Sequence, residues 1–318
     1  MICGEMNRTK HCSILRSMII GALEVLACLT TGLAQPQIYE RILSDYQRKD
    51  YSSAVALAAR AVETDGRNAS LRYIYGLSLI ELQRFSEASE NLSKAIELRP
   101  GDSNFHQGLA YLLCKQKKYD EAIPVLKRAI ELDGENLKAR FLLGLAYLSK
   151  ERSSLIGNFT ELALEQLQFV KAKQPTFPQV HLYIGKIHLT NGDVVGALEE
   201  FGAELEVDPR NVQAHMEAGE VLIKLNRPND ALVHLREVAL ASPMTTGLDY
   251  ALAKAYRQSG KINEAIAAAK RVLENNLRSA DAHYLLAQLY QDANKPDLAR
   301  EHMEAFEKLR VNKPSNGS

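Results

Sequence analysis

Along most of the chain, hydrophobic residues recur at the spacing expected of amphipathic helices. In the stretch Ala282–Gln291 the apolar positions are Tyr284, Leu285, Ala287, Leu289 and Tyr290. This spacing fits the helical period of 3.6 residues and not the strict alternation of a strand. The stretch Asn263–Leu273 repeats the pattern, and short runs such as Asn191-Gly192-Asp193 and Asn226-Arg227-Pro228 break it. The pattern predicts a helix, a tight turn and a second helix, repeated along the chain.

Small residues mark the period of this repetition. Alanines recur at positions 54, 88, 122, 163, 197, 231, 265 and 299, with six of the seven intervals equal to 34 residues and one equal to 41. A second small residue stands at the matching earlier position in seven of the repeats, as Gly76, Ala110, Gly144, Gly185, Gly219, Ala253 and Ala287, whereas the first repeat has Ile42. We interpret these positions as the points where two paired helices approach most closely. Self-similarity at such a period is the sequence signature of a stacked-repeat architecture.

These marks resemble the tetratricopeptide repeat. Leu143, Gly144 and Tyr147 match the first-helix core of that repeat, and Ala197, Phe201 and Pro209 match its second-helix alanine, aromatic residue and terminal proline. The early tryptophan of the family is absent, and His106, His181, His215 and His283 replace it in four repeats. The resemblance implies an all-α fold, a right-handed superhelical solenoid of helix-turn-helix units.

We expect eight tetratricopeptide repeats over residues 35–313, of which the first is degenerate. The long interval between alanines predicts an insertion at 149–160, between the two helices of the fourth repeat. The predicted repeats are 35–68, 69–102, 103–136, 137–177, 178–211, 212–245, 246–279 and 280–313, followed by a disordered tail at 314–318. The repeats use up this range, so we expect no separate catalytic domain.

The first 34 residues differ from the rest and predict an exported protein. Arg8, Lys10 and Arg16 precede an apolar stretch from Met18 to Leu33, and Gly32-Leu33-Ala34 offers small residues for cleavage. This order is typical of a secretory signal peptide, so a periplasmic or secreted location follows. An uncleaved membrane anchor and lipid attachment at Cys28 remain open. A cytoplasmic adaptor would follow if the N-terminus is misread.

Composition and charge narrow the function classes. The chain has 39 Lys and Arg against 39 Asp and Glu, which argues against a nucleic-acid partner, since nucleic-acid binders usually carry a basic excess. Only Cys114 lies outside the leader, so we expect neither an internal disulfide nor a cysteine metal cluster. His181, His215 and His283 share one repeat position, too far apart to ligate one metal ion, and we interpret them as packing residues. No nucleophile–base pair or phosphate-binding loop stands out. We therefore expect a non-enzymatic protein without a cofactor, a metal or a small-molecule substrate.

The candidate functional surface is the groove. In the family that the chain resembles, residues three before, one after and four after the first-helix small residue project into the concave face. This register predicts an apolar, aromatic strip with cations toward its C-terminal part, an expected interaction surface. The predicted peptide-binding residues are Tyr73, Leu77, Ile80, Tyr111, Phe141, Leu148, Lys186, Met216, Tyr250, Lys254, Arg257 and Tyr284.

The leading hypothesis is a non-catalytic scaffold that binds a peptide or helix of a partner protein in this groove, outside the cytoplasm. The competing hypothesis is a structural or oligomerisation module of an envelope or secretion assembly, which would use the outer faces or the terminal helices. In either case the expected partner is a protein, and contact with a membrane would be made only through a retained or lipidated leader.

Overall fold

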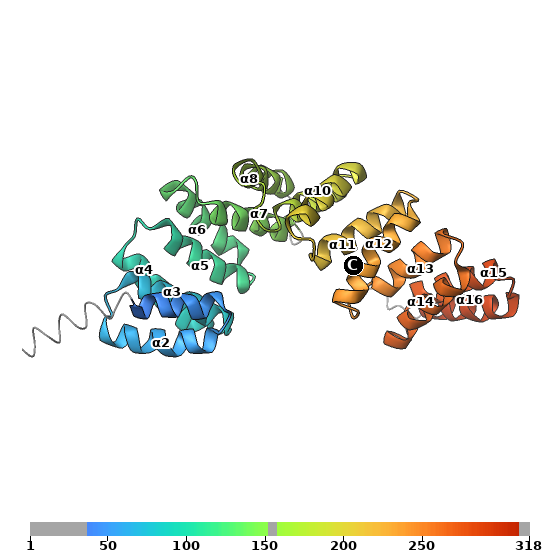
Figure 1. Ribbon diagram of the computed structural model, residues 1–318, viewed down its shortest axis with the longest axis horizontal. Coiled ribbons are helices and arrows are strands. Elements are labelled where there is room, and N and C mark those ends of the chain that lie inside the picture. The colour runs from blue at the N-terminus through green and yellow to red at the C-terminus, as the bar shows by residue number, and fades with distance from the viewer. Residues whose placement is uncertain (1–36, 152–157, 312–318) are drawn as a thin grey trace, which may run out of the picture. The chain divides into compact units, whose positions relative to one another are not determined.

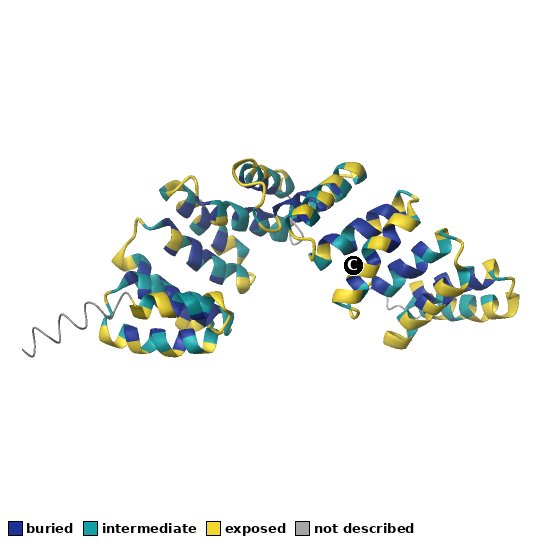
Figure 2. Cartoon of the chain, in the orientation of Figure 1, coloured by how far each residue is buried: buried dark blue, intermediate teal, exposed yellow. Residues whose placement is uncertain are grey.

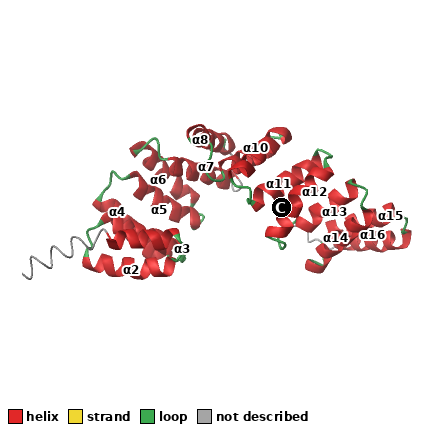
Figure 3. Cartoon of the chain, viewed as in Figure 1, coloured by secondary structure: helices red, strands yellow, loops and turns green. Residues whose placement is uncertain are grey.

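The computed structural model describes residues 37–151 and 158–311, and in these ranges every regular element is a helix (Figures 1 and 3). A helix at residues 37–47 comes first. The following helices are α2 (Tyr51–Thr64), α3 (Ala69–Glu81), α4 (Phe85–Leu98), α5 (Ser103–Lys115), α6 (Tyr119–Leu132), α7 (Leu137–Glu151), α8 (Phe159–Lys173), α9 (Val180–Thr190), α10 (Val194–Val207), α11 (Val212–Lys224), α12 (Pro228–Ala241), α13 (Leu248–Gln258), α14 (Ile262–Asn275), α15 (Ala280–Asp292) and α16 (Pro296–Val311). Each predicted repeat range contains two of these helices. The prediction of an all-α fold is confirmed for the described residues.

The chain divides into two compact units, residues 1–166 and 167–318, with the boundary inside α8. In the N-terminal unit α3 packs on α4, α5 packs on α6, and each pair stacks on the next. In the C-terminal unit the pairs are α9 with α10, α11 with α12, α13 with α14 and α15 with α16. We call the earlier member of each pair the first helix and the later member the second helix. Burial follows the seams between helices in both units (Figure 2).

Seven first helices, namely the helix at 37–47, α3, α5, α9, α11, α13 and α15, end in the same tight turn. The N–H of Arg84 donates to the carbonyl of Leu79 at 2.9 Å, and the N–H of Gln83 donates to that of Ile80 at 2.9 Å. This is the Schellman pattern, in which one residue takes a left-handed backbone conformation. Gln83 (φ 59°) fills that place here, and Lys49, Lys117, Gly192, Asn226, Gly260 and Asn294 fill it in the other turns. Only two of these residues are glycine, so the backbone geometry of the turn recurs without a conserved residue type.

Close contact between paired helices requires residues without a side chain. A Cβ atom on Gly76 would lie 2.7 Å from Cγ of Leu92, one on Gly185 would lie 2.6 Å from Cε1 of Phe201, and one on Gly219 would lie 2.8 Å from Cδ2 of Leu235. Each of these three large side chains stands four residues after the periodic alanine of its repeat, and those alanines are fully buried. At these three glycines a large side chain of the second helix packs directly against the backbone of the first helix, and we call these positions the glycine seats.

The insertion predicted at 149–160 is shorter than the sequence suggested. Helix α7 continues to Glu151 and α8 begins at Phe159, so both ends of that range are helical. Helix α7 has 15 residues against 13 in α5. Lys150 near its end reaches Asp120 of α6 and lies 5.1 Å above the ring of Phe159. Residues 152–157 lie outside the described part, as do the leader at 1–34 and the tail at 314–318. Among the helices that the structure describes, none has the length and apolar character needed to cross a membrane.

The glycine seats can be tested by a matched pair of substitutions on neighbouring helices. Gly185→Ala should lower the free energy of unfolding by about 1–3 kcal/mol, because its methyl group would overlap the ring of Phe201. Gly202→Ala on α10 meets nothing within 4 Å and should raise that free energy by about 0.5–1 kcal/mol through helix propensity alone. Urea unfolding followed by circular dichroism measures both. Equal shifts for the two variants would contradict the assigned seats.

Candidate functional site

The predicted peptide-binding residues all lie on first helices. In the N-terminal unit, Tyr73, Leu77 and Ile80 are on α3, Tyr111 is on α5, and Phe141 and Leu148 are on α7. In the C-terminal unit, Lys186 is on α9, Met216 is on α11, Tyr284 is on α15, and α13 carries Tyr250, Lys254 and Arg257. Successive first helices contact one another, α3 with α5 and α5 with α7 in one unit, and α11 with α13 in the other. We call the surface formed by these residues in each unit its first-helix face.

Two of the predicted residues are unavailable to a partner. Ile80 is 2 % exposed and packs in a cluster with Leu92 and Leu112. Met216 is 9 % exposed and belongs to the core formed by α11 to α15. Both side chains face the next pair of helices instead of the surface, so their prediction as contact residues was wrong.

The N-terminal face is organised around Glu81. The hydroxyl of Tyr111 on α5 donates to Oε1 of Glu81 on α3 at 2.7 Å, and Nζ of Lys115 lies 5.1 Å above the Tyr111 ring. Burial raises the pKa of the Tyr111 phenol, followed by the hydrogen bond to Glu81 and then by the negative charge of that carboxylate. The phenol therefore stays protonated at neutral pH and remains a hydrogen-bond donor.

More tyrosines surround this carboxylate than the sequence predicted. Burial, followed by the charge of Glu81, raises the pKa of Tyr46 to about 12, and the Tyr46 ring meets that of Tyr51 edge-on at 5.5 Å. Tyr46 stands four residues after Ile42, the position that corresponds to the small residue in other repeats. The groove register applied to this degenerate repeat would have found it. We call Tyr46, Tyr51, Glu81 and Tyr111 the tyrosine–glutamate cluster.

Tyr73 is held more deeply on the same unit. Its ring centroid lies 5.0 Å from that of Phe105 on α5, and a Cβ atom on Gly108 would lie 2.6 Å from its Cε2. Burial, ahead of the charges of neighbouring groups, raises its pKa. Tyr73 thus packs between first helices and presents only part of its ring. Leu77, Phe141 and Leu148 are half-buried on the same row of helices.

On the C-terminal face, two of the predicted contact residues, Lys186 and Arg257, form ion pairs with carboxylates on the next first helix. Nζ of Lys186 on α9 lies 3.2 Å from Oε1 of Glu217 on α11. Nε of Arg257 on α13 donates to Oδ2 of Asp292 on α15 at 2.7 Å, and its Nη1 donates to Gln288 at 2.5 Å. These cations therefore link successive first helices. The sequence predicted Lys186 and Arg257 as contact residues but did not indicate that their charges are already paired with carboxylates.

Aromatic residues remain accessible on this face. Tyr284 is 41 % exposed, and its ring centroid lies 5.1 Å from that of Phe306 on α16. Nζ of Lys254 lies 5.8 Å from the centre of the Tyr250 ring on the same helix. Burial, and then the neighbouring Glu217, raise the pKa of Glu220 on α11. A partner would contact this face through tyrosines and aliphatic stems more than through free charges.

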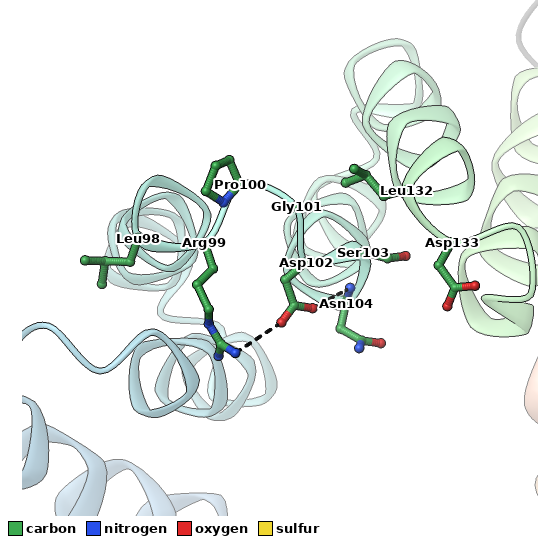
Figure 4. A pocket seen from close by; sticks show the side chains of 9 residues that line it. All are labelled: Leu98, Arg99, Pro100, Gly101, Asp102, Ser103, Asn104, Leu132 and Asp133. Atoms are coloured by element: carbon green, nitrogen blue, oxygen red, sulfur yellow. Dashed lines mark hydrogen bonds and ion pairs between the residues drawn. The ribbon is translucent and has the colours of Figure 1, made fainter.

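Two hollows lie beside loops between repeats. One of about 670 Å³ lies beside the α4–α5 loop and the end of α6, and it is lined by Leu98, Arg99, Pro100, Gly101, Asp102, Ser103, Asn104, Leu132 and Asp133 (Figure 4). Its one cation, Arg99, is already bound to Ser70 at 2.5 Å, lies 3.6 Å from Asp102 and stacks 4.7 Å above the ring of Phe105. A smaller hollow of about 340 Å³ lies beside Tyr250 where α13 begins.

Within the described ranges, no group of three or more His, Cys, Asp or Glu side chains is arranged to hold a metal ion. Cys114 is a free, partly buried thiol, and burial raises its pKa to about 11. A thiol that stays protonated at neutral pH is a poor nucleophile.

Comparison with known proteins gives a consistent result. The tetratricopeptide repeat family matches residues 39–103, 184–243 and 250–316, and further matches to such repeats cover 91–123 and 110–150. The chain is 20% identical over 235 residues to the TPR repeat-containing protein YpiA of Bacillus subtilis, covering 74% of this chain and 52% of YpiA. It is 22% identical over 267 residues to MJ1428 of Methanocaldococcus jannaschii, another TPR repeat-containing protein, covering 79% of this chain and 45% of that one. The chain spans about half the length of these relatives.

Solved structures show the same fold. PilF of Pseudomonas aeruginosa superimposes with a TM-score of 0.63 at 17% identity, over 70% of this chain and 99% of PilF. A chain of the APC/C hetero-tetramer Cut9–Hcn1 superimposes with a TM-score of 0.58 at 17% identity, over 83% of this chain and 51% of that chain.

The pairing on the C-terminal face can be measured by a double-mutant cycle on Lys186→Met and Glu217→Gln. We expect a coupling free energy of about 0.5–1 kcal/mol, because both side chains are partly buried. The coupling should shrink at high salt. The exposed pair Arg84–Glu87 is the control, and it should couple by about half that or less. Strictly additive effects of the Lys186 and Glu217 substitutions would rule out the linking role.

Proposed function

Since the chain belongs to the tetratricopeptide repeat family, we propose that it is a non-catalytic scaffold that holds an extended or helical segment of a partner protein against its first-helix faces. Members of this family are generally non-catalytic scaffolds and typically bind protein partners. Stacked repeats favour such a role, because they offer a long continuous surface and bury their core only between neighbours.

The observation that carries the proposal is the tyrosine–glutamate cluster of the N-terminal unit. Its rings supply apolar contact at small entropic cost, as aromatic anchors do at protein interfaces. Glu81 supplies one carboxylate among neutral phenols, which favours a partner segment with a cationic or hydrogen-bond-donating side chain flanked by apolar residues. The half-buried Phe141 and Leu148 extend the apolar surface along the unit.

The C-terminal face supports a secondary contact. Its ion pairs already satisfy Lys186 and Arg257, so these residues would shape the surface without attracting a charged partner. Tyr250 and Tyr284 are the remaining anchors. We propose that the face of the N-terminal unit is the main binding surface and that the face of the C-terminal unit, taken by itself, binds a partner more weakly.

A second candidate function is supported by a different observation. In the C-terminal unit, large apolar side chains are exposed on second helices and on the loops between repeats, namely Val195, Val233, Leu240, Met244 and Leu277. Such exposure favours an assembly interface on the outer surface. In that case light scattering would show a mass that rises with concentration, and Leu240→Ser would lower it.

To test the peptide-holding role, Tyr111→Ala and Phe141→Ala can be combined in one variant and compared with the natural chain. Crosslinking in the native compartment, followed by mass spectrometry, should show partner recovery reduced by about tenfold or more, because two interface anchors are lost. Circular dichroism should show unchanged helicity. Val195→Ala with Val233→Ala on the outer surface is the control and should retain capture. Full capture by the Tyr111/Phe141 variant would contradict the proposal.

We further propose that the protein acts outside the cytoplasm, on the basis of the leader pattern at residues 1–34. N-terminal sequencing of the native protein is expected to begin at Gln35, after cleavage behind Ala34. A retained Met1 or Met6 would contradict cleavage, and a lipid-modified Cys28 would support anchoring instead.

A further inference from the structure

One position in the repeats forms a recurring clasp, where the family's early tryptophan would stand. The residue at this position binds the carbonyl oxygen of the residue six positions earlier, at the end of the preceding repeat. The observed contacts are Arg72 Nε to Gly66 at 2.6 Å, His106 Nε2 to Pro100 at 2.9 Å, Arg140 Nε to Gly134 at 2.9 Å, His181 Nε2 to Pro175 at 3.0 Å, His215 Nε2 to Pro209 at 3.1 Å and His283 Nε2 to Leu277 at 3.4 Å.

Five of these six side chains also bind the second helix of their own repeat. In the N-terminal unit Nη1 of Arg72 donates to Asn91 at 3.1 Å, and Nη1 of Arg140 donates to Gln166 at 3.1 Å. In the C-terminal unit His181 meets Glu200 at 2.6 Å. The other two histidine clasps differ in kind. Nδ1 of His215 faces Nδ1 of His234 at 3.0 Å, and Nδ1 of His283 faces Nδ1 of His302 at 3.0 Å.

The hydrogen bonds of these two histidine pairs determine which ring nitrogens carry a proton and which protonation states keep the pair bonded. The Nε2 atom of His215 faces a carbonyl oxygen, which only accepts, so this nitrogen carries the proton. In the neutral ring Nδ1 is then bare and accepts a hydrogen bond from Nδ1–H of His234. If both rings become cations, two N–H groups face each other across 3.0 Å and the bond is lost. His283 and His302 obey the same rule.

The groups around each pair disfavour the state in which both imidazoles are protonated. His234 is flanked on its own helix by Asp230 and Glu237 and faces His215 on α11; burial, and then the charge of His215, lower its pKa despite the two carboxylates. His302 is flanked by Glu301, faces His283 on α15 and Lys270 of α14, and stacks on Tyr290 at 5.5 Å. Burial, and then the charge of His283, lower its pKa.

The sign of the pH effect follows from this lowering. A histidine with a lowered pKa binds fewer protons in the folded chain than in the unfolded chain. Its stabilising contribution is therefore complete above the unfolded pKa of about 6.5 and is lost as the pH falls below that value. Each excluded proton reduces the folding equilibrium constant by up to about tenfold per pH unit in this range.

We propose that the pairs His215–His234 and His283–His302 make the helix pairs α11–α12 and α15–α16 an acid-sensitive part of the chain, in which the paired helices separate more readily as the pH falls below about 6.5 while the N-terminal unit stays unchanged. The clasps of Arg72 and Arg140 carry a fixed charge and bind neutral amides, so they do not change in this range. His106 is followed nineteen residues later by Val125 and so lacks a second imidazole at this place.

The clasp of His181 provides a contrast within the same unit. Its partner is a carboxylate, so protonation of the ring strengthens the pair instead of breaking it. Burial acts to raise the pKa of Glu200, but hydrogen bonds from Lys171 and His181 outweigh it, and the net pKa is lowered. The stability from Glu200 is lost only as the pH falls below the ordinary carboxyl pKa, under the range in which the histidine pairs respond.

Hydrogen exchange of the full chain at about pH 7.5 and about pH 5, corrected for intrinsic exchange rates, tests the proposal. Protection in α11–α12 and α15–α16 should fall by about tenfold or more at the lower pH, and protection in α3–α4 should change by less than about threefold. Equal loss in all helices, or no loss in the C-terminal pairs, would overturn it.

Two variants separate the histidine pairs from general acid effects. The variant His234→Gln with His302→Gln keeps a hydrogen-bond donor next to His215 and His283 but removes the second titratable ring of each pair. The loss of exchange protection at about pH 5 should therefore disappear. His234→Glu with His302→Glu imitates the clasp of His181 and should make the two helix pairs more protected at about pH 5 than in the natural chain. NMR titration of the imidazoles in the natural chain is the measurement that needs no variant. The proposal would be overturned if both variants lost as much exchange protection at about pH 5 as the natural chain. It would also be overturned if NMR gave His234 and His302 the pKa of an exposed histidine.

Discussion

The fold depends on close contacts within the helix pairs, and in three pairs a glycine on the first helix receives a large side chain of the second helix. Gly76 receives Leu92, Gly185 receives Phe201, and Gly219 receives Leu235. Burial of apolar surface supplies the free energy of folding, but it is non-directional. The seats supply direction, because a close-packed interface accepts a second helix in only one rotation and register.

That rotation determines which side chains meet the neighbouring repeat and which stay on the surface. It places the fourth residue of most repeats against the end of the preceding repeat, where Arg72 and His215 bind backbone carbonyl groups. It also brings successive first helices close enough for Tyr111 to bind Glu81 and for Arg257 to bind Asp292. The proposed partner surface and the proposed acid-sensitive clasps therefore have the same structural origin.

The sequence located the candidate face but misassigned some of its members. Ile80 and Met216 share the register of the exposed residues, yet they are buried, because their helices are turned toward the next pair. Glu200 binds Lys171 and His181 in the structure, and no motif in the sequence indicates this contact. Tyr46 was missed because the first repeat lacks the small residue that marks the register elsewhere.

The sequence by itself determined the helices, their pairing and their repeat period, because helix propensity, turn formation and the need for small residues at a close contact are local properties that recur every 34 residues. Only the tertiary structure decided how polar side chains share their hydrogen bonds. Partners such as His283 and His302 are nineteen residues apart in sequence and 3.0 Å apart in space. Their distance depends on how the two helices are rotated and packed, which no single position in the repeat encodes.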